Sequence, residues 1–188
     1  MPVRVATIVM IETIETDRLL MRPFEAADLD VLVVLHEEES FGWYPLKRGM
    51  TPEETAGFLD RVLSTYARDE LSFHALVDRT TGSVIGWAGL SVPTFLPEVL
   101  PAVEVGWRLA AGARGQGYAT EAGAAAIAWG FASLGLAEIL SIFEPDNVAS
   151  GSVMDRLGFG PGFATVHPTA EVPLLVRTLT EEQWRAAG

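Results

Sequence analysis

The sequence predicts a single α/β domain built on a mixed sheet of six to seven strands flanked by helices. Its 188 residues, 49% of them apolar, are enough for one self-sufficient hydrophobic core. Strand-like and helix-like segments alternate irregularly, and a short turn at residues 80–82 joins two of the strands. Such hairpins exclude a doubly wound parallel sheet, and the sequence shows no recurring period of the kind that repeat proteins have.

The first third of the chain is expected to hold one strand and two helices. Residues 12–24 fit a strand that ends at Pro23, and apolar residues at helical spacing over 29–35 indicate the first helix. A second helix is predicted from Thr51 to about Tyr66. There a threonine cap is followed directly by proline and, at the third position, by glutamate, which is a helix-initiation signal.

The rest of the chain is expected to alternate strands with two further helices. An alanine-rich helix over 118–134 is closed by Gly135, and a short helix ends at Leu157 with Gly158 as its cap. The strands are predicted at residues 72–78, 83–92, 103–109, 137–143, 163–167 and 172–178.

Charge and composition exclude several classes of function. The 13 lysines and arginines against 25 aspartates and glutamates give a net charge of −12, which argues against nonspecific binding to nucleic acid. The absence of cysteine excludes disulfides and thiolate zinc sites, and three histidines far apart in sequence make a metal centre unexpected. No apolar run approaches the roughly 18 residues of a membrane span, so a cytoplasmic protein is expected.

The most informative segment is the glycine-rich stretch that follows the strand at 103–109 and opens the alanine-rich helix. Gly115 and Gly117 lack side chains, so a phosphate group can approach the backbone there. The start of the following helix adds partial positive charge, and Arg114 adds a full one. The segment is therefore a candidate pyrophosphate cradle.

Two familiar nucleotide sites do not fit this segment. A dinucleotide-binding fingerprint requires a third glycine where Thr120 stands, and its loop starts directly after the strand, whereas about five residues intervene here. A P-loop requires a lysine beside the last glycine, and the only lysine of the chain is Lys47.

Three stretches, in the right order, resemble the GCN5-related N-acetyltransferase (GNAT) superfamily, and in particular its RimJ/RimL-like branch. They are RGQGYA at 114–119, TDRLLMRP at 16–23 and NVASGSVMDRLGF at 147–159. The resemblance covers residues 12–185 and implies one N-acetyltransferase domain over 1–188, with 1–11 as an extension. It also implies a mostly antiparallel sheet whose two central strands splay apart, those at 103–109 and 137–143.

The resemblance implies acetyl-CoA as co-substrate, with no metal. The backbone of the strand at 103–109 would pair with the pantetheine amides, because an extended ligand can satisfy the exposed edge of a splayed strand. Carried over residue by residue, the implied cofactor contacts are Trp107, Arg108, Leu109, Arg114, Gly115, Gln116, Gly117, Tyr118, Ala119, Thr120, Asn147 and Ser150.

The implied reaction is transfer of an acetyl group to a primary amine by direct attack in a ternary complex. The amine would be a protein N-terminal α-amine or a small molecule. In many members of the family, a tyrosine that protonates the leaving group stands at the position of Met154. Ser150, one turn earlier, is therefore the substitute candidate for this acid. It could equally bind cofactor or cap the helix. The missing tyrosine also leaves open a non-catalytic acyl-CoA-binding sensor or interaction module of the same fold.

Glu104 is the candidate general base. A carboxylate between two valines of a central strand is costly unless it is paired or used, so a buried carboxylate satisfied by hydrogen bonds is the alternative. Strand alternation places Glu104 on one face and Trp107 on the other, and leaves open which face meets the acceptor. His74 and His167 are weaker candidates.

The acceptor is expected to lie beside the segment between the first two helices. Three glutamates there, with Glu38 at their centre, could attract a cationic amine, while Trp43 and Tyr44 form an aromatic wall. A solvated acidic turn beside core aromatics is the alternative. These aromatics and the apolar stretch at 7–11 could also serve a homodimer interface.

Overall fold

The computed structural model describes residues 12–37, 48–68 and 70–187, and they form an eight-stranded sheet in the order β1-β2-β3-β4-β5-β6-β8-β7. Neighbouring strands are antiparallel except for β5 and β6, which are parallel. The strands are β1 (Ile14–Glu15), β2 (Leu19–Arg22), β3 (Phe73–Asp78), β4 (Val84–Ser91), β5 (Glu104–Leu109), β6 (Glu138–Phe143), β7 (Phe163–Val166) and β8 (Pro173–Thr180). The predicted fold class, a mixed and mostly antiparallel sheet flanked by helices, is confirmed.

The extra strand arises because the segment at 12–24 is a hairpin rather than one strand. Thr16 reverses the chain: its backbone N donates to Leu19 O at 2.9 Å, and its Oγ1 accepts from Leu19 N at 3.0 Å. Ile14 then pairs with Met21 across β1 and β2. The expectation of six to seven strands is corrected to eight for this reason.

Five α-helices flank the sheet within the described residues: α1 (Leu29–Glu37), α2 (Pro52–Tyr66), α3 (Tyr118–Ala132), α4 (Val148–Arg156) and α5 (Glu181–Ala187). The predicted start of α2 is confirmed, since Thr51 Oγ1 accepts from Glu54 N at 3.2 Å and Glu54 Oε2 accepts from Thr51 N at 2.8 Å. The C-terminal helix α5 was not predicted.

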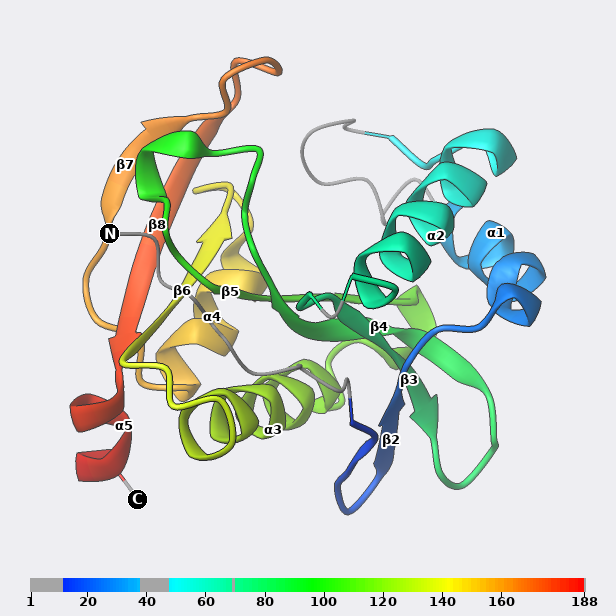
Figure 1. The fold of residues 1–188 in the computed structure, drawn as a ribbon, viewed down its shortest axis with the longest axis horizontal. Coiled ribbons are helices and arrows are strands. Elements are labelled where there is room, and N and C mark those ends of the chain that lie inside the picture. Colours follow the sequence, from blue (N-terminus) through cyan, green and yellow to red (C-terminus); the bar gives the residue numbers. More distant parts are fainter. Residues whose placement is uncertain (1–11, 38–47, 69, 188) are drawn as a thin grey trace.

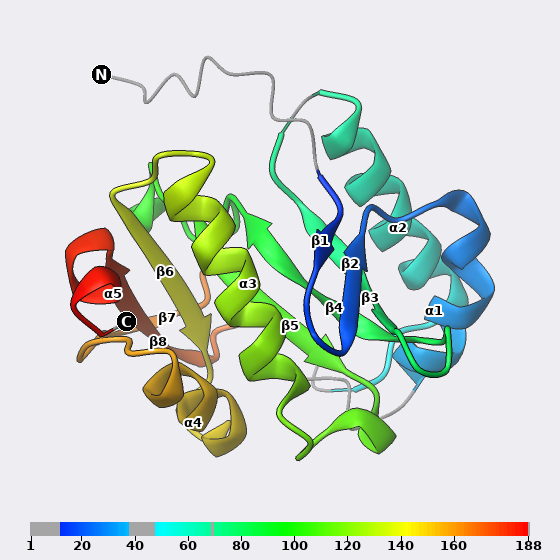
Figure 2. The ribbon, with the colours of Figure 1, turned by 90° about the horizontal axis from the view of Figure 1, so that it is seen from below.

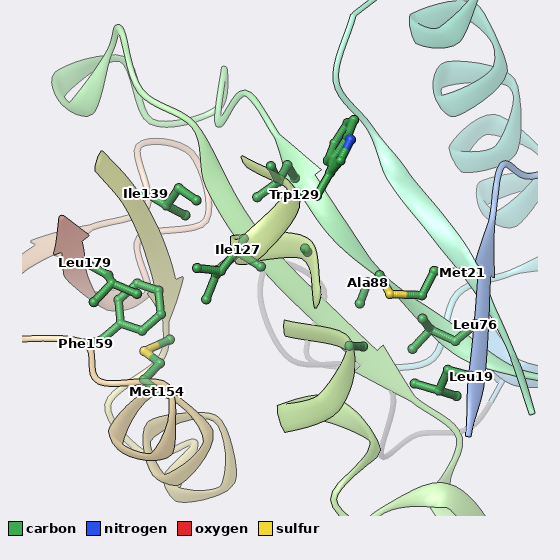
Figure 3. Close-up of a cluster of buried hydrophobic side chains, with 14 of the residues drawn as sticks. Leu19, Met21, Leu76, Ala88, Ile127, Trp129, Ile139, Met154, Phe159 and Leu179 are labelled. Atoms are coloured by element: carbon green, nitrogen blue, oxygen red, sulfur yellow. The ribbon is translucent and has the colours of Figure 1, made fainter. Parts of the chain in front are cut away.

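The helices cover opposite faces of the sheet (Figure 1). Helices α1 and α2 lie over β3 and β4, where Leu32, Leu59 and Trp87 belong to one buried cluster. Helix α3 crosses the other face, and Figure 2 shows it lying over the region where β5 and β6 separate. The largest buried cluster lies beneath α3 and includes residues from both sides of that separation, among them Ala88 of β4 and Ile139 of β6 (Figure 3).

Two glycines let α3 approach both sides of the sheet closely. A Cβ atom at Gly130 would lie 2.9 Å from Leu90 Cδ1 of β4 and 2.9 Å from Ile139 Cδ1 of β6. Two turns earlier, a Cβ at Gly123 would lie 2.9 Å from Leu157 Cδ1 and 3.5 Å from the Trp107 ring. Because the 2.9 Å distances are shorter than van der Waals contact, a side chain at either position would displace the ends of these neighbouring side chains, and glycine lets α3 pack closely without that shift.

The sheet opens between β5 and β6. Their register is a single pair, Glu104 opposite Leu140. Leu140 N donates to Val103 O at 3.0 Å, and the Ser141 hydroxyl donates to Val105 O at 2.9 Å. Beyond that point β5 continues along β4 as far as Leu109, while β6 continues along β8. The two central strands therefore diverge, as expected from the resemblance.

None of the helices in the described part of the chain is long and apolar enough to cross a lipid bilayer. The same described residues contain no cluster of three or more histidine, aspartate or glutamate side chains that could hold a metal ion.

Candidate active site

A cleft of about 1190 Å³ occupies the space between the diverging strands β5 and β6. Strand β5, the glycine-rich turn, the first turn of α3, the end of β6 and helix α4 all contribute to its walls. The residues predicted from the sequence that line it are Glu104, Trp107, Arg108, Leu109, Arg114, Gly115, Gly117, Tyr118, Ala119, Thr120, Asn147 and Ser150. The structure thus brings together eleven of the twelve predicted cofactor contacts and the candidate base.

The edge of β5 that faces the cleft presents backbone polar groups. Val103 O and Val105 O point toward β6, where they accept their hydrogen bonds, whereas Ala110 N points the other way and donates to Ile85 O at 2.9 Å. Because backbone groups alternate along an antiparallel strand, the N–H and C=O of Trp107 point into the opening as well. An extended ligand can therefore add to this edge as a strand would.

The glycine-rich turn begins with the short 3-10 helix η4 (Ala111–Ala113) and ends at α3. Gly115 and Gly117 adopt left-handed conformations, with φ of 72° and 86°, which only glycine adopts at little cost. Gly117 is the N-cap of α3 and has no side chain to cap it. The first-turn N–H groups of α3 therefore lie at the cleft wall, where they can bind an anion.

Gln116 is the predicted cofactor contact that does not line the cleft. Its side-chain Nε2 donates to Gly112 O at 2.6 Å, and its backbone O accepts from Arg18 Nη1 at 2.9 Å. Gln116 instead lines a smaller cavity of about 240 Å³ beside Asp78 and Tyr118. Its side chain faces away because the left-handed glycines on either side reverse the chain at this point.

Asn147 and Ser150 have separate roles at the start of α4. Asn147 Oδ1 accepts from Ser150 N at 3.1 Å, so the asparagine caps the helix and the serine side chain is not needed for that purpose. Met154 is only 1% exposed and belongs to the core beneath α3. Its thioether has no proton to donate, so Ser150 remains the candidate acid on this helix.

Glu104 is buried and only 8% exposed. Its carboxylate accepts a hydrogen bond from Ser91 Oγ at 2.9 Å, and Ser91 stands directly opposite on β4. Burial raises the pKa of Glu104 to about 7, although the hydrogen bond from Ser91 lowers it in part. The carboxyl group is therefore poised to gain or lose a proton near neutral pH.

Trp107 lies on the face of β5 toward α3, whereas Glu104 lies on the face that α1 and α2 cover. On this face, Phe73 and Trp87 line the cleft with ring centroids 4.5 Å apart. A Cβ at Gly106 would lie 3.2 Å from the Phe73 ring, so a larger residue at this position would press on the ring. The site thus has an aromatic wall beside its buried carboxyl group.

The orientation of Trp87 is fixed by a buried histidine. Trp87 Nε1 donates to His36 Nε2 at 3.3 Å, and His36 Nδ1 lies 3.1 Å from Thr55 Oγ1. Burial lowers the pKa of His36 to about 4, so the imidazole ring is neutral at physiological pH. Its Nε2 can therefore accept the hydrogen bond from the indole N–H. The Arg108 guanidinium lies 5.7 Å from the Trp87 ring centre.

Sequence reasoning missed Phe73, Trp87 and Ser91 as site residues. The only local signal was the pair of glycines that flanks Trp87 and its neighbour in β4, at positions 86 and 89. His74 and His167 are not among the described residues that line the cleft: His74 packs against Trp129, and His167 stacks on Phe95. Glu38, Trp43 and Tyr44 lie outside the described residues.

Known proteins share both the sequence pattern and the fold. The family model described as "Acetyltransferase (GNAT) domain" matches residues 18–160. The uncharacterised N-acetyltransferase p20 of Bacillus licheniformis is 27% identical over 149 residues, which are 79% of this chain and 82% of that protein. The crystal structure of a GNAT-family acetyltransferase from Bacillus anthracis superposes with a TM-score of 0.75 at 21% identity, over 91% of this chain and 99% of that one.

A third similarity is to a structure that contains a ligand. RimL, described as a ribosomal L7/L12 alpha-N-protein acetyltransferase in complex with coenzyme A, superposes with a TM-score of 0.73 at 14% identity. The superposition covers 90% of this chain and 98% of that one.

The superpositions show that the splayed mixed sheet of this chain is the fold of those acetyltransferase structures. The chain belongs to the acetyltransferase (GNAT) domain family, and it is an N-acetyltransferase.

Proposed function

We propose that this protein transfers an acetyl group from acetyl-CoA to a primary amine, by direct attack within a ternary complex. One observation carries the proposal: the open edge of β5 and the glycine-rich turn border the same cleft. An open strand edge suits the amides of a pantetheine arm, and a turn of left-handed glycines that leads into a helix suits a pyrophosphate.

The described residues fit this donor along the length of the cleft. The backbone of Trp107, Arg108 and Leu109 would pair with the pantetheine arm, and residues 114–120 would hold the pyrophosphate, with Gln116 contributing backbone only. Asn147 and Ser150 face this cleft from α4. Within a chain of net charge −12, Arg114 and the helix start supply the local attraction that a polyanionic donor requires.

Acetyl-CoA supplies a thioester whose carbonyl carbon the amine attacks; a C–N bond forms, the C–S bond breaks and coenzyme A leaves. A cleft-facing N–H of β5 would stabilise the negative charge that develops on the carbonyl oxygen. Glu104 would accept the proton that the amine loses, directly or through a water molecule. Ser150 would donate a hydrogen bond or a proton to the departing sulfur.

The pKa of Glu104 favours an α-amine as acceptor. A carboxylate with a pKa of about 7 lies about one unit below an α-amine, near 8, but more than three below a lysine side chain, near 10.4. The proton transfer to Glu104 is therefore much less costly from an α-ammonium group. The acceptor would be a protein N-terminus or a small molecule with such an amine.

We also assign the chain to the RimJ/RimL-like branch of the family. The stretches at 16–23 and 147–159 support this assignment, and the RimL structure shows the same fold. The acidic and aromatic residues Glu38, Trp43 and Tyr44 remain our predicted acceptor contacts.

The test is to incubate the purified protein with acetyl-CoA and a panel of acceptors, and to follow thiol release. The panel pairs each peptide that has a free N-terminus with the same peptide blocked there but carrying a lysine. We expect turnover on free N-termini or small α-amines, and little on the blocked peptides. Binding of coenzyme A without turnover on any acceptor would instead indicate the non-catalytic module, and no binding would overturn the proposed function.

A further inference from the structure

The β1–β2 turn lies against the start of α3 and contacts it through Arg18. The Arg18 backbone N donates to Glu121 Oε1 at 2.9 Å, and Nε donates to Oε2 at 2.7 Å. Nη2 lies 2.6 Å from the same carboxylate, and Nη1 donates to Gln116 O at 2.9 Å. Thr16 Oγ1 adds a hydrogen bond to Glu121 Oε1 at 2.6 Å. Arg18 therefore contacts both the glycine-rich turn, at Gln116, and the first turn of α3, at Glu121.

Glu121 places a negative charge at the wall that would receive a pyrophosphate. It lies in the first turn of α3 and lines the cleft. Although burial acts to raise its pKa, the hydrogen bonds from Thr16 and Arg18 outweigh that effect and lower it, so the group is ionised at neutral pH. Without a counterion this carboxylate would repel an anionic donor. Arg18 supplies the counterion.

The bond from Arg18 to Gln116 also fixes the direction of the next N–H group. In a trans peptide the carbonyl and the following N–H point in opposite directions. Because Gln116 O points to Arg18, the N–H of Gly117 points away from it. The guanidinium also lies 4.5 Å from the ring centre of Tyr118, which begins the helix. Arg18 therefore contacts the backbone carbonyl before Gly117 and the ring of the residue after it.

Arg18 makes these contacts on the side of the glycine-rich turn that does not line the cleft. It is not among the described residues that line the cleft, whereas Glu121, Gly117 and Tyr118 are. We propose that Arg18 is a positioning residue for the pyrophosphate of the donor: it neutralises Glu121 and turns the Gly117 N–H toward the cleft, without touching the donor itself. The proposal rests on the proposed function, because it requires a donor that carries a pyrophosphate.

Calorimetric titration with coenzyme A tests the proposal. We expect Arg18→Ala to weaken binding about tenfold or more, because it leaves an uncompensated carboxylate at the site. Adding Glu121→Gln to Arg18→Ala removes that charge, and we expect the double variant to recover much of the affinity. Arg68→Ala removes an equal charge from a surface pair with Glu70 and is the matched control, with unchanged affinity expected.

A donor without pyrophosphate separates positioning from general damage to the fold. With acetyl-CoA, we expect Arg18→Ala to raise KM and leave kcat nearly unchanged. With S-acetylpantetheine, which lacks the pyrophosphate, kcat/KM should be the same for Arg18→Ala as for the wild type. Thermal unfolding of every variant without ligand shows how much stability each change removes.

The outcomes distinguish the two proposals. If the wild type binds coenzyme A and Arg18→Ala binds it equally well, the role of Arg18 is wrong and the proposed function stands. An equal loss with both donors would show a merely structural role and overturn the inference. If Glu121→Gln restores no affinity in the double variant, neutralisation of Glu121 is not what Arg18 contributes, and the inference as stated is overturned. If the wild type binds no coenzyme A, the proposed function itself fails.

Discussion

The ionisation of Glu104 has opposite effects on its proposed role as a base and on the stability of the fold. Its carboxyl group is buried and has one hydrogen-bond partner among the described residues, the hydroxyl of Ser91. In the unfolded chain it titrates near pH 4.5, but in the folded protein near pH 7. Between these values the folded state holds a proton that the unfolded state has released, so stability falls as the pH rises through this window. The ionised form that a base requires is thus the form that destabilises the fold.

The first prediction concerns Glu104→Gln. If Glu104 is the base, the substitution lowers kcat/KM at pH 7.5 about 100-fold or more and removes a rising limb near pH 7 from the pH profile. The same variant should be more stable than the wild type at pH 8, by at most about 3 kcal/mol, because the buried charge is gone.

Steady-state kinetics over pH 5.5–9 and urea unfolding at pH 4.5 and pH 8 measure these two effects. Affinity for coenzyme A should not change and serves as the control. A variant that keeps both its activity and its pH limb would show that Glu104 is only a buried structural carboxyl group.

A second prediction concerns Gly117. From the sequence, a side chain here would be expected to obstruct a phosphate, but in the structure its Cβ would lie 3.3 Å from Arg18 Nη2. We expect Gly117→Ala to cost about 1–2 kcal/mol of stability through its φ of 86° and also to weaken coenzyme A binding by displacing Arg18.

The matched control is Gly135→Ala. Gly135 has a φ of 65°, but a Cβ there would meet nothing within 4 Å. It should show a similar loss in thermal stability with no change in affinity for coenzyme A. Equal effects of the two substitutions on binding would contradict the role given to the contact with Arg18.

At the scale of elements, local chemistry decides which helix ends can be predicted. The start of α2 follows from its capping box, and α4 ends beside Gly158 as expected, because both signals lie within a few residues. The same kind of signal precedes α5: Thr180 Oγ1 accepts from Gln183 N at 3.2 Å, and Gln183 Oε1 accepts from Thr180 N at 2.9 Å. The sequence therefore contained the information for α5, although the prediction missed it.

The capping box of α2 gives a third prediction. Thr51→Ala removes the acceptor for Glu54 N and should lower the free energy of unfolding by about 1 kcal/mol, as measured by urea denaturation. Thr65→Ala, at the other end of the same helix, removes an exposed bond to Arg61 O and a long one from Arg68 Nη2, and should change stability by less than about 0.5 kcal/mol. Neither should alter coenzyme A affinity; equal losses of stability would contradict the assignment of the cap.

The site could be predicted only where its residues are neighbours in sequence. The glycine-rich turn and the Asn147 cap are local patterns, and the structure places them at one cleft. The partner of Glu104 could not be found, because Ser91 meets it only through the register of β4 on β5. The contacts of Arg18 with Glu121 likewise join residues that are 103 positions apart.

At the scale of the whole molecule, buried histidines set the response to acid. Burial lowers the pKa of His36 and His74 to about 4 and also lowers that of His167, whereas unfolded histidines titrate near 6.5. Between these values the unfolded state binds more protons, so stability falls as the pH decreases from 6.5 to 4. Glu104 has the opposite effect over most of this window and offsets one of these histidines.

The fourth prediction is therefore a net loss of stability on acidification. The free energy of unfolding, measured by urea denaturation, should be lower at pH 4.5 than at pH 6.5. His74→Leu should make this dependence shallower, and Glu104→Gln should make it steeper. Stability that is constant or rises on acidification over this range would show that these groups do not titrate as described.

The glycines of α3 have a consequence for the width of the opening between β5 and β6. A Cβ atom at position 130 would press on both Leu90 of β4 and Ile139 of β6, and one at position 123 would press on Leu157 and meet Trp107. Both parts of the sheet thus pack against one helix at places where it carries no side chain. An added methyl group at position 130 would push against β4 and β6 together, so we expect it to change the separation of the strands, and with it the affinity for the donor, although Gly130 does not line the cleft.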